Sequence, residues 1–205
     1  MKRALLLAVL LAPAHAGDVF TDGAAGAKVH EASGFVCPGK IGEFERDAVG
    51  QRDPEAHEDY CAYSALDGVY AGVTLRPLPK NYDPREALAA NFAVLDGTGG
   101  KLLAEWVQWL GPKTSQVSAY LRSYETARLE SIHYRTVFAS AAVGGWAVQV
   151  TVEYADPRDR ELEQAFLNAV YDSAIAKIAD PPASPDVRRN DVKKAGLTSL
   201  DQHKQ

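Results

Sequence analysis

The chain has 205 residues, of which 22 are basic and 27 acidic, so that its net charge is −5. This acidic balance argues against binding of nucleic acid, whose affinity comes mainly from Lys and Arg side chains that neutralise phosphates. An apolar content of 46% suits a single globular domain with an ordinary core.

The first 16 residues predict a cleavable signal peptide. Lys2 and Arg3 are followed by an apolar run over residues 4–12 and by the small-x-small site Ala14-His15-Ala16. The run is too short to span a membrane, which takes about 20 apolar residues. An N-terminal helix of the domain is the alternative, but it would have no polar face. We therefore expect a periplasmic or secreted protein with no integral membrane segment in the mature chain.

Cleavage near Gly17 would change the charge of the protein. Removing Lys2 and Arg3 from the 22 basic residues leaves 20 against 27 acidic ones, a net charge near −7. Such a charge favours solubility and selects no particular partner.

After a flexible entry segment at 17–28, residues 29–179 predict a single domain that begins with β-structure. Asp67-Gly68 separates two alternating runs, which is the strongest short-range signal of a β-hairpin. Strands are predicted in this half of the domain at 33–37, 41–46, 59–65 and 69–76.

Cys37 and Cys61 are the two cysteines of the chain. An even, small number of cysteines in an exported protein predicts a disulfide. Two separate buried thiols are the alternative. A redox-active pair is disfavoured because such cysteines usually lie in a Cys-x-x-Cys motif at the start of a helix.

Two helical stretches are expected in the middle of the chain. Asp83 can cap the first, and Pro84 suits its first turn. The second covers residues 101–110, where Trp106 and Trp109, three residues apart, would share one face. These indoles are either core residues or the aromatic wall of an apolar groove that binds a ligand or partner.

The second half of the domain predicts further strands and a closing helix. Residues 146–154 alternate most clearly, so Val148 and Val150 should be core positions and Gln149 should face outward. A long helix is expected to end near Ile178, and residues 180–205 form a polar tail of disordered composition. Other strands are predicted at 115–122 and 129–141. The fold class is therefore α+β, with an antiparallel sheet of about six strands and helices packed on it.

Several segments resemble the PsbP-like fold, which is shared by photosystem extrinsic proteins, Mog-type Ran-binding proteins and the DcrB group of bacterial envelope proteins. The resemblance rests on residues 34–38, 41–44, 69–75 and 145–157. It implies a PsbP-like α/β sandwich whose members act mostly as binding or accessory proteins. It carries no ligand residues over to this chain.

Residues 53–59 form an acidic loop in which His57, Glu58 and Asp59 could bind a divalent cation through oxygen and imidazole ligands. Their spacing matches neither an EF-hand nor a zinc motif, and the alternative is a solvated acidic loop. His30-Glu31 lacks the second histidine of a metalloprotease helix.

These patterns favour an exported, non-enzymatic protein that binds an unknown envelope protein or a small apolar ligand, with no cofactor expected. The alternative is a hydrolase-type envelope enzyme that uses His57 or His133 with nearby carboxylates. A pocket that joins either histidine to carboxylates would favour the enzyme, and an apolar groove at the tryptophans would favour binding.

Overall fold

The computed structural model describes residues 19–65, 69–111, 117–129, 132–156 and 159–178. The predicted signal peptide and the predicted polar tail lie outside these ranges, as does the Asp67-Gly68 turn. None of the helices within the described ranges is both long and apolar enough to cross a bilayer.

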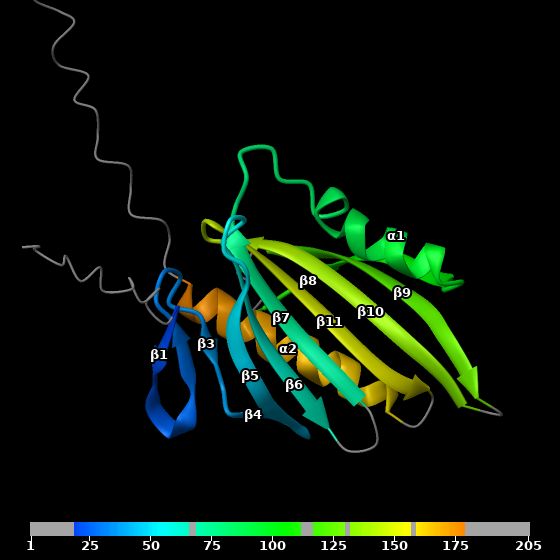
Figure 1. Ribbon diagram of the computed structural model, residues 1–205, viewed down its shortest axis with the longest axis horizontal. Coiled ribbons are helices and arrows are strands. Elements are labelled where there is room, and N and C mark those ends of the chain that lie inside the picture. Colours follow the sequence, from blue (N-terminus) through cyan, green and yellow to red (C-terminus); the bar gives the residue numbers. More distant parts are fainter. Residues whose placement is uncertain (1–18, 66–68, 112–116, 130–131, 157–158, 179–205) are drawn as a thin grey trace, which may run out of the picture.

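The domain is built on an eight-stranded antiparallel sheet with the strand order β4-β5-β6-β7-β11-β10-β9-β8 (Figure 1). Its strands are β4 (Lys40–Ile41), β5 (Phe44–Asp53), β6 (Glu58–Ala65), β7 (Val69–Pro77), β8 (Lys101–Trp109), β9 (Ser118–Leu129), β10 (Ile132–Val143) and β11 (Trp146–Asp156). The expectation of about six strands was therefore too low, although the α+β class is confirmed.

A second, three-stranded sheet precedes the main one and consists of β1 (Phe20–Asp22), β2 (Lys28–His30) and β3 (Val36–Cys37). A single 3-10 turn, η1 (Ala24–Gly26), joins β1 to β2. The described part of the predicted entry segment thus forms paired strands, with Phe20 opposite His30. In Figure 1 this small sheet lies beside the β4–β5 edge of the main sheet.

Helix α2 (Arg160–Lys177) packs across one face of the main sheet (Figure 1). Its buried residues Phe166, Val170 and Tyr171 belong to the same core as Val148 and Val150 of β11, both of which are almost completely buried. The sequence-based assignment of these valines to the core is confirmed. This is the larger of the two hydrophobic cores.

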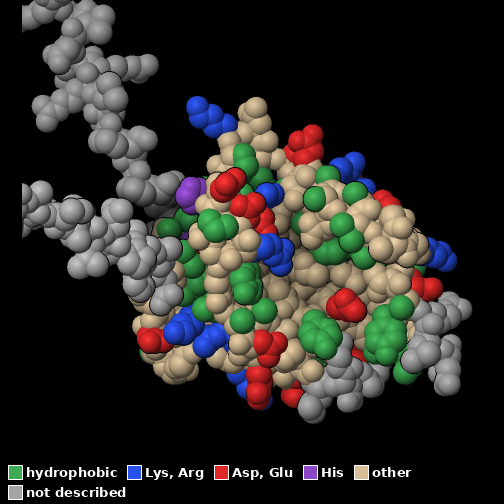
Figure 2. Space-filling model, viewed as in Figure 1, with side chains coloured by type: hydrophobic (Ala, Val, Ile, Leu, Met, Phe, Trp, Pro, Cys, Tyr) green, Lys and Arg blue, Asp and Glu red, His purple; other side chains and the backbone are tan. Residues whose placement is uncertain are grey.

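The opposite face carries the 3-10 turn η3 (Glu86–Leu88) and helix α1 (Ala89–Gly97). Helical structure begins at Glu86, although Asp83 does accept a hydrogen bond from the backbone of Arg85. Leu88 and Phe92 pack there in a small cluster with Tyr120, Tyr124 and Phe138. Figure 2 shows basic and acidic side chains interspersed over the visible surface in the same view.

Because both faces of the sheet are covered, Gln149 does not face solvent as the alternation predicted. It is 9% exposed, and its side-chain amide donates to the carbonyl of Ala87 at 2.8 Å. A buried amide needs such a partner. A strand that is covered on one face alternates between apolar and polar residues, and so does a strand whose second face is covered by a thin layer. The predicted exposure of Gln149 was wrong for this reason.

The predicted second helix at 101–110 is instead strand β8, which pairs antiparallel with β9. Sheet pairing overrides the local helical preference of this segment. Residues three apart in a strand point to opposite faces. Trp106 accordingly packs against the larger core, whereas Trp109 is 72% exposed. The structure does not bring the two indoles together on one surface.

Candidate functional site

The end of β2 and the turn that follows it bring His30 and Ser33 next to Asp59 of β6. The backbone N–H of Gly34 donates to the carbonyl of His30 at 2.8 Å, which closes the turn. Gly34 has a φ of +73°, and a Cβ there would lie 3.0 Å from the carbonyl oxygen of Lys177. Both the backbone conformation and the close approach to α2 therefore favour glycine at this position.

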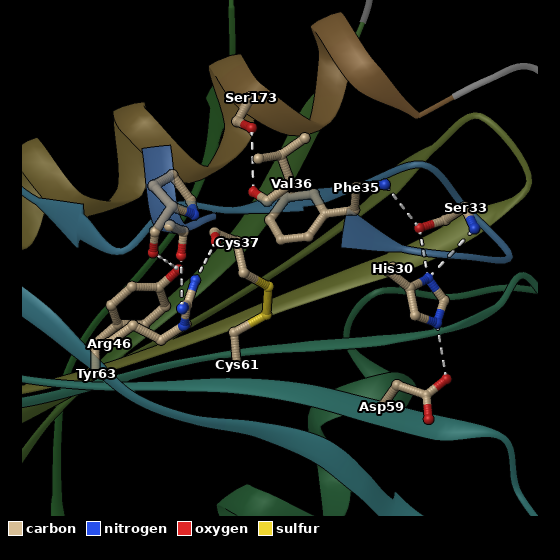
Figure 3. Close-up of a disulfide and its surroundings, with 12 residues drawn as sticks. His30, Ser33, Phe35, Val36, Cys37, Arg46, Asp59, Cys61, Tyr63 and Ser173 are labelled. Carbon is tan, nitrogen blue, oxygen red and sulfur yellow. Dashed lines mark hydrogen bonds and ion pairs between the residues drawn. A yellow bond between two sulfur atoms is a disulfide. The ribbon is translucent and has the colours of Figure 1, made fainter. Parts of the chain in front are cut away.

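His30 is buried at the centre of this region, with 1% of its surface exposed. Its Nδ1 lies 2.7 Å from Ser33 Oγ, and its Nε2 lies 2.9 Å from Asp59 Oδ2 (Figure 3). The imidazole also contacts the rings of Phe20 and Trp146, at centroid distances of 5.1 and 5.0 Å. His30 is thus fixed on every side by packing and hydrogen bonds.

The surrounding donors assign the tautomer of His30. The backbone N–H of Ser33 points at Nδ1 from 3.3 Å. Ser33 Oγ accepts the N–H of Phe35 and lies within hydrogen-bond distance of Nδ1. Because the backbone N–H of Ser33 is directed at Nδ1, Nδ1 is the acceptor, so Nε2 carries the proton and donates to Asp59. The imidazole is therefore neutral in this arrangement.

The predicted disulfide joins Cys37 of β3 to Cys61 of β6 beside this array, with a Cα–Cα distance of 6.4 Å (Figure 3). Arg46 of β5 donates to the carbonyls of Cys37 and Gly26 at 2.7 and 2.8 Å. Burial raises the pKa of Tyr63, which remains a neutral donor to the Pro38 carbonyl. These contacts fix the small sheet against β5 and β6.

A pocket of about 460 Å³ opens next to His30. This volume lies within the range usual for small-molecule sites, which combine an apolar lining with a few polar groups. Apolar contact comes from Val19, Ala32, Pro77 and Trp146, and polar contact comes from His30, Glu31, Gln51, His57 and Asp59.

Asp59 is the most constrained acidic group of the pocket wall. Only 4% of its surface is exposed, and its Oδ2 accepts from His30. Its other oxygen, Oδ1, is buried and has no hydrogen-bond partner within the described structure. A buried polar atom without a partner costs free energy. Asp59 therefore contributes to the pocket wall a buried carboxylate with one acceptor unused.

The three residues of the predicted cation site do not converge. His57 and Asp59 both line the pocket, but Glu58, one position from each, forms an ion pair with Arg52 at 3.3 Å. Alternation along β6 separates Glu58 from Asp59 onto opposite faces. Among the residues that the structure describes, no group of three or more His, Cys, Asp or Glu side chains is arranged to hold a metal ion.

His133, the second histidine of the enzyme hypothesis, lies on β10. Its Nδ1 is 2.8 Å from Glu125 of β9, and its backbone is opposite Asp156 of β11. It belongs to a surface ion-pair group on the strands and does not line the pocket at His30.

Ser33, His30 and Asp59 have the residue types of a hydrolase triad, but Ser33 is poorly placed as a nucleophile. It is 3% exposed, does not line the pocket, and uses its oxygen to accept the N–H of Phe35. A serine nucleophile must reach the substrate carbonyl. The array therefore serves to position Asp59.

No protein-family model matches the chain, and no curated protein matches it by sequence. Among solved structures, it is similar to cyanobacterial PsbP (CyanoP) from Synechocystis sp. PCC 6803. The identity is 11%, the TM-score is 0.41, and the match covers 79% of this chain and 91% of that one. The name PsbP belongs to that cyanobacterial protein, and a likeness of this strength assigns no function to this chain.

Proposed function

We propose that the protein is exported and acts without catalysis, by binding a small ligand in the pocket beside His30 and Trp146. The observation that carries the proposal is Asp59, whose buried Oδ1 has no partner within the described structure although the residue lines the pocket. The array of His30 and Ser33 holds this carboxylate in place, so the acceptor is preorganised for a ligand.

Export is supported by the signal-like N-terminus and by the disulfide between Cys37 and Cys61, a bond typical of oxidising compartments. A binding role is favoured over hydrolysis because the only hydroxyl in the His30 array, that of Ser33, is buried away from the pocket.

The proposal is tested with N-phenyl-1-naphthylamine, a neutral probe whose fluorescence rises in apolar surroundings. We expect saturable enhancement with the purified protein. Ala32 is exposed and lines the pocket, so Ala32→Trp should fill the space and abolish the enhancement. Ala165→Trp, on the exposed side of α2, is the matched control and should bind as the wild type does. Enhancement that does not saturate, or that survives in Ala32→Trp, would overturn the proposal.

A further inference from the structure

The wall of the pocket beside His30 carries more negative than positive charge. Among the described residues that line it, Glu31 and Asp59 are carboxylates and none is Lys or Arg. His30 adds no positive charge in this arrangement, because the backbone N–H of Ser33 is directed at its Nδ1 and the ring proton lies on Nε2. Asp59 therefore receives a hydrogen bond from a neutral group.

A buried carboxylate of this kind is stabilised best by a cation that reaches it. Taking an ionised carboxylate out of water costs free energy unless a positive charge or several donors compensate. Asp59 is 4% exposed and has one donor on Oδ2, while Oδ1 lacks a partner in the described structure. An ammonium group carries N–H donors and the missing charge together.

The rest of the pocket suits the remainder of such a ligand. Trp146 is partly exposed and offers an indole, the aromatic group that attracts cations most strongly. Val19 and Pro77 supply apolar contact. Val19 is held in place because its carbonyl accepts the backbone N–H of Glu31 at 3.0 Å.

From these observations we propose that the pocket selects organic cations: small molecules with a protonated amine and an apolar body. This inference rests on the proposed binding function and adds the ligand class. The ammonium is directed to the carboxylates of Asp59 and Glu31, and the apolar body lies against Trp146. Anionic ligands are rejected because they would bring a like charge to a wall that already holds two carboxylates.

The test compares three probes of similar size on one aromatic frame: 2-phenylethylammonium, 2-phenylethanol and 3-phenylpropanoate. Each is titrated as a competitor of N-phenyl-1-naphthylamine. We expect the ammonium compound to bind about tenfold more tightly than the alcohol, which corresponds to one charge-assisted hydrogen bond, and the anion to bind most weakly.

Variants locate the selectivity. Asp59→Asn should remove most of the preference for the ammonium compound, measured as the ratio of the affinities of the ammonium compound and the alcohol for the same variant. Glu31 is exposed, so Glu31→Gln carries little risk to folding and should reduce the preference by about two- to threefold. Asp172→Asn, an exposed carboxylate on α2 outside the pocket, is the matched control and should change nothing.

The outcomes separate the two proposals. Saturable naphthylamine binding with equal affinity for the ammonium compound and the alcohol, or with tighter binding of the anion, overturns the cation inference and leaves the binding function standing. Absence of naphthylamine binding and of binding by all three compounds overturns both. If Asp59→Asn fails to fold, the wild-type comparison and Glu31→Gln still decide the matter.

Discussion

The Nε2 atom of His30 lies 2.9 Å from Oδ2 of Asp59, which joins β2 of the small sheet to β6 of the main sheet across 29 residues of sequence. Both side chains are buried, so this contact couples the stability of the two sheets to the shape of the pocket.

Removing His30 should therefore be costly. His30→Ala leaves the buried carboxylate of Asp59 without its donor, and we expect a loss of about 3 kcal/mol in the free energy of unfolding. Asp59→Asn keeps an oxygen that can accept from Nε2 and should cost about 1–2 kcal/mol. Lys28→Ala is the control, because its partner Asp22 is 89% exposed, and it should cost under about 0.5 kcal/mol. Urea denaturation followed by circular dichroism measures all three, and equal losses would contradict the buried contact.

Gln149 and Val150 face opposite cores, so both substitutions should destabilise the protein. Val150→Ala leaves a cavity beneath α2 and should cost about 1–3 kcal/mol. Gln149→Ala removes the donor to the Ala87 carbonyl and should cost about 1 kcal/mol. Gln164→Ala, on the exposed side of α2, is expected to change stability by under about 0.5 kcal/mol. Thermal melts would contradict the contact if Gln149→Ala behaved like Gln164→Ala.

The disulfide gives a third expectation. Titration of thiols in denaturant without reductant should detect none, because Cys37 and Cys61 are bonded and the chain has no other cysteine. Reduction should lower the free energy of unfolding by about 3 kcal/mol, since the bond closes a loop between residues 24 positions apart. A Cys37→Ser/Cys61→Ser variant should melt like the reduced protein and should not respond to reductant. Two titrating thiols would refute the bond.

We expect the contribution of Asp156 to the free energy of unfolding to be lost in acid. Its hydrogen bonds to Arg160 lower the pKa of this buried carboxyl below the ordinary value of 3.8, with a further contribution from Arg135. A lowered pKa means that the carboxylate stabilises the fold above pH 3.8 and that this contribution is lost as the pH falls through the lowered value. Asp156→Asn should therefore cost about 1–3 kcal/mol at neutral pH.

The measurement for Asp156 is the difference in unfolding free energy between wild type and variant at several pH values. This difference should shrink as the pH falls below 3.8. Asp172→Asn, which alters an exposed carboxylate, should show no such trend. A difference that stays constant into acid would contradict the ion pair.

The helices and strands predicted best are those in which the spacing of apolar residues matches the buried face. Strand β11, the hairpin strands β6 and β7, and helix α2 follow from alternation and helical spacing. Strand β8 was missed because its exposed edge position leaves few alternating apolar residues, and its leucines and tryptophans fit a helix equally well. Strand pairing with β9, a non-local contact, decides the outcome.

The pocket was predicted in part only. His57 and Asp59 were singled out, but as ligands of a cation, because neighbours in sequence were taken as neighbours in space. His30 was dismissed for want of a second histidine. A signal for it existed: Asp59 shares a strand face with Cys61, and the bond from Cys61 to Cys37 brings the segment around residues 30–37 to that face.

The two cores of the sheet are unequal, and this has a consequence for motion. The 18-residue α2 lies on the large core. The segment from η3 to the nine-residue α1 packs on the small cluster through Leu88 and Phe92, and the side-chain amide of Gln149 donates to the Ala87 carbonyl of η3. Segments with few buried apolar contacts open at lower free energy than the whole domain unfolds. The segment from η3 to α1 should therefore exchange its amide hydrogens through local opening, and each opening event exposes the aromatic surface around Phe138 while the disulfide-linked half of the protein stays closed.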